Sequence, residues 1–187
     1  LFEVSFGQFD DVSGTLAADR TSDENRYLVG VEWAATTITS GTFKIGYQQR
    51  SFPDVSFNDV DGLSYFLDML WQPNSYTRIK IGAKRATDES AELNIGGFIS
   101  TGYSLGLEHA LSARTQLKAR YEHDKADLTF VQDRTDIRNS IKIGIAHSLR
   151  TWLDISLDYR HLTRSSNDEI YAFSSDAVEM TLTTTFD

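Results

Sequence analysis

Residues 139–149, Asn-Ser-Ile-Lys-Ile-Gly-Ile-Ala-His-Ser-Leu, alternate between apolar and polar side chains. Ile141, Ile143 and Ile145 share one face of an extended chain, whereas Lys142 lies on the other. Successive side chains of a β-strand point to opposite faces, so this period of two predicts a strand with one apolar and one polar face.

Similar alternating segments recur along the whole chain, and helical spacing of apolar residues is not sustained anywhere. Each segment is about ten residues long, which is the length that a tilted strand needs to cross a bilayer. The expected strands, about ten in number, lie near residues 2–9, 26–36, 41–50, 63–72, 76–85, 98–111, 115–124, 139–149, 153–160 and 178–186.

The composition excludes several classes of protein. The chain has 187 residues, 27 acidic and 18 basic side chains and no Cys. The lack of Cys excludes a disulfide scaffold, Cys-ligated zinc and thiol catalysis. The net charge of -9 argues against a nucleic-acid partner, because phosphate contacts need clustered Lys and Arg. The sequence has no run of about 18 apolar residues, so it predicts no transmembrane helix.

The expected connections alternate between short turns and long loops, as in bacterial outer-membrane barrels. Aromatic residues sort by rim: Trp lies near the short turns and Tyr near the long loops, which predicts two membrane-interface girdles. The girdle residues are Trp33, Trp71, Trp152, Tyr47, Tyr121 and Tyr159.

Three features favour an apolar face that meets lipid over one that forms a soluble core. The charged face is rich in Gly, Ser and Thr, the strands are long, and the last segment ends on an aromatic residue, Phe186, one residue before Asp187. We therefore expect residues 1–187 to form one all-β domain: a transmembrane antiparallel up-and-down β-barrel, whole or the carboxy-terminal part of a larger one. Its expected place is a Gram-negative outer membrane, with outer-membrane lipid as a partner.

The polar face is then expected to line a lumen for the transport of polar solutes. A ladder of ion pairs that only stiffens the wall would use the same side chains, and the pattern leaves both interpretations open. The candidate lumen-lining residues are Lys44, Arg50, Arg78, Lys80, Lys84, Lys118, Arg120, Arg138, Lys142, Arg160, Asp154 and Asp158.

No motif points clearly to catalysis, a metal or a cofactor, so we expect none of them. The His residues all lie on the apolar face near strand ends, where anchoring at the membrane interface is the favoured role; a membrane lipase or deacylase is an alternative. The acidic turn at 58–62 lacks the other ligands of a calcium loop.

Several hairpin motifs together resemble the outer-membrane β-barrel porins of exopolysaccharide biosynthesis operons. They are Gly30-Val31-Glu32-Trp33, Ser40-Gly41-Thr42-Phe43, Gly46-Tyr47, Arg50, Phe52, Gly62-Leu63-Ser64-Tyr65, Trp71-Gln72-Pro73, Thr77, Gly82, Arg85 and Glu89-Ser90. The resemblance covers roughly residues 26–187.

This resemblance implies a part in exporting an anionic or neutral polysaccharide, with a periplasmic polysaccharide-export protein and an inner-membrane copolymerase as partners and no catalytic residues. Members of that family are larger barrels, so the chain is either the carboxy-terminal part of such a barrel or similar in architecture alone. A small structural or adhesive barrel with acidic ligand-binding loops is the alternative function.

Overall fold

The computed structural model describes residues 1–9, 21–34, 38–54, 58–89, 97–128 and 134–185. It contains β-strands joined by turns, with one short 3-10 helix, η1 (Glu169–Tyr171). The strands are β1 (Phe2–Phe9), β2 (Ser22–Trp33), β3 (Thr39–Ser51), β4 (Val60–Asn74), β5 (Thr77–Glu89), β6 (Gly97–Ser112), β7 (Thr115–Asp127), β8 (Thr135–Arg150), β9 (Leu153–Ser166) and β10 (Phe173–Thr184). No helix in these ranges is long and apolar enough to span a membrane.

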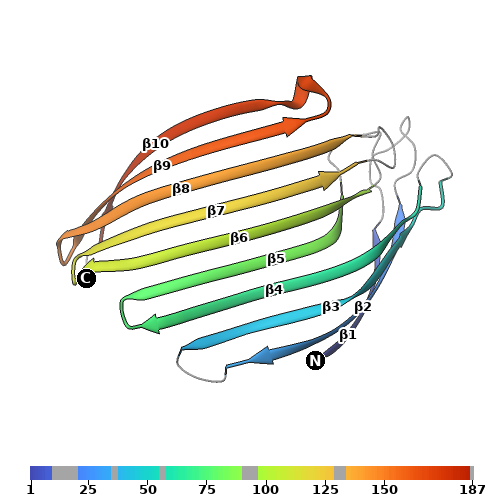
Figure 1. Ribbon diagram of the computed structural model, residues 1–187, viewed down its shortest axis with the longest axis horizontal. Coiled ribbons are helices and arrows are strands. Elements are labelled where there is room, and N and C mark those ends of the chain that lie inside the picture. The colour runs from blue at the N-terminus through green and yellow to red at the C-terminus, as the bar shows by residue number, and fades with distance from the viewer. Residues whose placement is uncertain (10–20, 35–37, 55–57, 90–96, 129–133, 186–187) are drawn as a thin grey trace.

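The strands form one antiparallel sheet in which every strand lies beside its neighbours in the sequence (Figure 1). This up-and-down order confirms the predicted fold class, including the expectation of about ten strands. The sheet is not closed: in the described part of the chain β1 pairs with β2 alone and β10 with β9 alone. The structure is therefore a curved barrel wall with two open edges.

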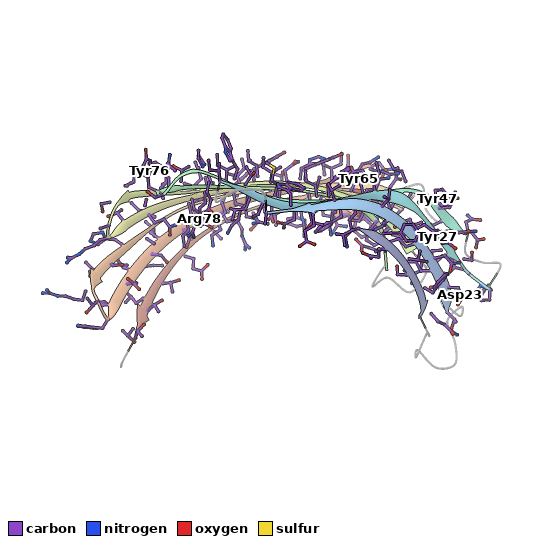
Figure 2. All side chains as sticks on the ribbon, turned by 90° about the horizontal axis from the view of Figure 1, so that it is seen from below. Asp23, Tyr27, Tyr47, Tyr65, Tyr76 and Arg78 are labelled. Atoms are coloured by element: carbon purple, nitrogen blue, oxygen red, sulfur yellow. The ribbon has the colours of Figure 1, made fainter. Side chains whose placement is uncertain are left out.

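The sheet is arched, so that one face is convex and the other concave (Figure 2). Tyr65 and Tyr76 lie on the convex side of the arch, and Arg78 lies on its concave side. The alternation of side chains carries this assignment along the strands, up to the register shifts at the short-turn ends of β4, β6 and β8. The apolar sets, such as Ile141, Ile143 and Ile145, therefore lie on the convex face, and their polar neighbours lie on the concave face.

Burial in this sheet is the reverse of that in a soluble protein. The buried hydrophobic residues of the described chain are four, Leu28, Phe52, Val60 and Leu128, whereas nine polar or charged residues are buried. Ile143 and Leu157, at the centre of their strands, are each 49% exposed. Because such an apolar surface is unfavourable in water, the convex face requires an apolar environment.

Glycine on the concave face permits close approach of neighbouring strands and side chains. A Cβ atom added at Gly46 would lie 1.8 Å from the backbone oxygen of Tyr27, and one added at Gly30 would lie 2.2 Å from the backbone oxygen of Phe43. Both contacts are between β2 and β3, so a larger residue at either position would force these strands apart.

Most strands extend further toward the long loops than the sequence predicts. The expected strand at 115–124 continues to Asp127, and the one at 153–160 continues to Ser166. These extensions carry polar side chains on both faces, so the period of two in hydrophobicity is lost although the backbone remains extended. Hydrogen bonds to the neighbouring strand, which hydropathy does not report, hold them in place.

Gly46→Ala is expected to destabilise the sheet by about 1–3 kcal/mol, because the new methyl group overpacks the β2–β3 interface. Gly106→Ala is the matched control, since its Cβ would meet its nearest neighbour, Lys80 Cβ, at an ordinary 3.5 Å. Urea unfolding of both variants in lipid vesicles measures the difference. Equal stabilities would show that the close approach at Gly46 is not a constraint.

Candidate transport surface

Cross-strand charge pairs cover the concave face of β5 to β9. Lys80 Nζ lies 2.8 Å from Glu108 Oε1, Arg138 Nη2 lies 3.2 Å from Asp124 Oδ2, and Lys142 Nζ lies 3.5 Å from Asp158 Oδ1. The basic partners are about half exposed, so their charges remain hydrated while they pair. The concave face of β5 to β9 is therefore polar and wettable, whereas β4 places Phe66 and Leu70 on this face.

The structure places the predicted lining residues in different environments. Lys44 pairs with Glu3 across β2, and Asp154 is exposed beside the short turn between β8 and β9. Within the described ranges, no carboxylate lies within ion-pair distance of Lys84, Lys118 or Arg160.

Arg50 differs from the other predicted lining residues because it is only 2% exposed. Its Nε donates to Ser22 Oγ at 2.9 Å, and its guanidinium lies 5.7 Å from the centre of the Phe52 ring. It thus packs into the wall near the long loops. Transport by any of the lining residues stays a prediction.

Two further glycines make room for the charged side chains. A Cβ at Gly144 would lie 2.2 Å from Asp158 Oδ1, and one at Gly102 would lie 2.8 Å from Asp124 Oδ1. Gly144 on β8 therefore leaves room for the carboxylate of Asp158 beside Lys142. Gly102 on β6 leaves room for one carboxylate oxygen of Asp124, whose other oxygen pairs with Arg138 on β8. This is the physical reason why the charged face alternates long side chains with glycine.

Shallow cavities lie between these side chains. One of about 250 Å³ is lined by residues that include Lys80, Gly106, Arg120 and Lys142. Another, of about 370 Å³, lies nearer the long loops and includes Asp68. These hollows belong to the wall itself and can hold water or small polar groups.

The convex face carries an apolar band between two aromatic rims. Trp33, Trp71 and Trp152 lie at the short-turn end, whereas Tyr47, Tyr121 and Tyr159 lie toward the long loops. Tyr76 is an exception, because it lies at the short-turn end, away from Tyr27, Tyr47 and Tyr65 (Figure 2). That these two rims lie at the membrane interfaces stays a prediction.

Tyrosine hydroxyls at the long-loop rim find polar partners, as amphipathic rings at an interface do. Tyr159 donates to Asp176 Oδ1 at 2.6 Å, and Tyr47 donates to Asp61. The hydroxyls of Tyr65 and Tyr103 are 2.8 Å apart, bridging over β5.

Each of the four His residues bonds through Nδ1 to the residue directly opposite on the neighbouring strand. The distances are 3.0 Å for His109 and Thr77, 2.9 Å for His147 and Thr115, 2.8 Å for His123 and Asn139, and 2.7 Å for His161 and Asp176. These bonds join strands at the two rims, and the anchoring role at the membrane interface stays a prediction.

An ionic cluster that sequence patterns did not predict lies at the long-loop end. Asp136, 6% exposed, lies 2.6 Å from Arg164 Nη2 and 3.3 Å from Arg134 Nε. The Arg134 guanidinium lies 3.9 Å from the centre of the Tyr171 ring, in η1. These residues come from three separate segments, so no local motif could reveal them.

Of the acidic loop residues, Asp10, Asp11, Asp19 and Glu92 lie outside the described ranges, and ligand binding by these loops stays a prediction. Asn58, Asp59, Asp61 and Gly62 do lie in described segments. No group of three or more acidic or His side chains suited to a metal occurs among the residues that the structure describes.

An antiparallel arch with an apolar convex face, aromatic rims and a charged concave face defines a membrane β-barrel wall. The chain belongs to the family described as "Putative beta-barrel porin 2", whose model matches residues 3–186. Searches of curated proteins and of solved structures found no match.

Ile143→Arg is expected to cost about 2–4 kcal/mol of stability in bilayers, because it places a charge on the lipid face near the middle of β8. Ser140→Arg, on the concave face of the same strand, is the control and is expected to fold normally. Unfolding in urea from lipid vesicles measures both. If Ile143→Arg were as stable as the control, the convex face would not contact acyl chains.

Asp136→Ala is expected to cost about 3–5 kcal/mol, because it removes the buried carboxylate that pairs with the buried Arg134 and the partly exposed Arg164. Asp176→Ala is the control: its side chain is 61% exposed, so a much smaller loss is expected. Tryptophan fluorescence during denaturation measures both changes. Losses of similar size would mean that the buried cluster does not hold the long-loop rim together.

Proposed function

We propose that the concave face forms part of the wall of a water-filled passage through a Gram-negative outer membrane, and that the passage serves the export of an extracellular polysaccharide. The observation that supports a passage is that charged side chains on the concave face are about half exposed, while the convex face of the same sheet is apolar. Such a wall favours hydrated solutes over apolar ones.

Polysaccharide is proposed as the cargo for two reasons. Family membership supports a porin-like barrel. The resemblance of the hairpin motifs to barrels of exopolysaccharide operons favours a sugar polymer. Hydroxyl-rich chains can exchange water for hydrogen bonds with the polar side chains of such a wall. A periplasmic export protein is the proposed partner at the short-turn end. The role is passive and needs no catalytic residue.

The passage is tested with single cysteines, since the chain has none of its own. Lys84→Cys on the concave face and Ala83→Cys on the convex face are neighbours on β5. In planar bilayers, a bulky water-soluble thiol reagent is expected to reduce the current through the full-length Lys84→Cys protein and to leave Ala83→Cys unchanged. An absence of conductance, or equal sensitivity of both variants, would contradict the passage.

The cargo is tested in the source cell by deletion of the gene and measurement of secreted polysaccharide. We expect secretion to fall while polymer accumulates in the periplasm, and the intact gene to restore export. Normal secretion from the deletion strain would overturn the polysaccharide assignment but leave the passage standing.

A further inference from the structure

The sheet register brings four basic residues to one level of the concave face. Lys80 on β5 faces Gly106 on β6, which in turn faces Arg120 on β7. Arg120 faces Lys142 on β8, and Lys142 faces Arg160 on β9. We call Lys80, Arg120, Lys142 and Arg160 the basic row. It crosses five neighbouring strands at right angles to the chain direction.

Like charges directly opposite each other on neighbouring strands destabilise a sheet. Arg120, Lys142 and Arg160 are opposed in this way on three consecutive strands. A ladder that only stiffened the wall would alternate signs at this level. The repulsion within the row therefore indicates that it has another role.

Carboxylates on the concave face, in the rows of residues on either side of the basic row, balance part of its positive charge. Glu108 lies 2.8 Å from Lys80, Glu122 lies 2.8 Å from Arg120, and Asp158 lies 3.5 Å from Lys142. None of these carboxylates belongs to the row itself. Within the described ranges, Arg160 has no carboxylate within ion-pair distance.

The charged groups of the row remain accessible from the concave side. The side chains of Lys80, Arg120 and Lys142 are 53%, 51% and 45% exposed. Gly106, which has no side chain, leaves a gap between Lys80 and Arg120, and the cavity of about 250 Å³ lies at this point. The row thus combines several hydrogen-bond donors with room for a group of a few atoms.

We propose that the basic row is a binding subsite for anionic groups on the passing solute, namely carboxylate, sulfate or phosphate substituents of a sugar chain. Guanidinium and ammonium groups form charge-assisted hydrogen bonds with these oxyanions, and rows of basic side chains make a pore selective for anions. The proposal rests on the passage proposed above. It assigns the cargo to acidic rather than neutral polymers.

The test uses the full-length protein in planar bilayers, with the double variant Arg120→Gln and Lys142→Gln. The reversal potential in a KCl gradient is expected to shift toward cation selectivity. Block of the current by an oligomer of galacturonic acid is expected to weaken about tenfold or more, since charge-assisted hydrogen bonds are lost. A neutral malto-oligomer of the same length is expected to act equally on both proteins.

Lys84→Gln with Arg138→Gln is the matched control, because it removes two concave-face charges from a different level of the wall. A smaller shift of the reversal potential in this control supports the proposed binding role of the basic row, whereas an equal shift overturns it.

The double variant Arg120→Lys with Lys142→Arg keeps the charge of the basic row and is expected to retain anion selectivity. Loss of selectivity in this variant would also overturn the proposed binding role. If the wild-type protein conducts ions without selectivity, the anion-binding role of the basic row is wrong but the passage stands. If the wild-type protein does not conduct, the proposed passage is wrong.

Discussion

The apolar side chains of this sheet have no protein interior to enter, and that constraint governs the rest of the structure. Ile143 and Leu157 lie at the centre of long strands with half of their surface uncovered, while Arg134 and Asp136 are buried. In water this arrangement would leave hydrophobic burial too small to offset the loss of chain entropy. In a bilayer the same convex face is solvated by acyl chains, and the concave face can hold water.

Backbone hydrogen bonding is the second requirement, because groups that face lipid cannot bond to water. The antiparallel meander meets it from β2 to β9, since each strand there has two partners. The outer sides of β1 and β10 have no partner strand in the described residues, and barrel closure is the usual way to remove such edges. The rims add side-chain bonds between strands, as His161 and Tyr159 do through Asp176.

The sequence predicted much of this because its signals were local. The phase of alternation placed Ile143 and Lys142 on opposite faces, and turn lengths predicted the strand order. The same phase, followed past Ala83, also puts Arg85 on the convex face, where it donates to Thr101. The burial of Arg50 and the charge row across β5 to β9 depend on register and long-range contacts. Alternation within single strands carries no information about either.

The most direct test of the account is a cysteine scan along β8, from Ser140 to His147, in reconstituted bilayers. We expect fluorophores attached at positions 141, 143 and 145 to be quenched by lipids with quenchers on their acyl chains. Positions 140, 142 and 144 should instead react with a water-soluble reagent, which gives an alternation of period two. The claim that the convex face meets lipid would be contradicted by quenching at positions 140, 142 and 144 with water access at 141, 143 and 145. It would also be contradicted if no alternation were seen.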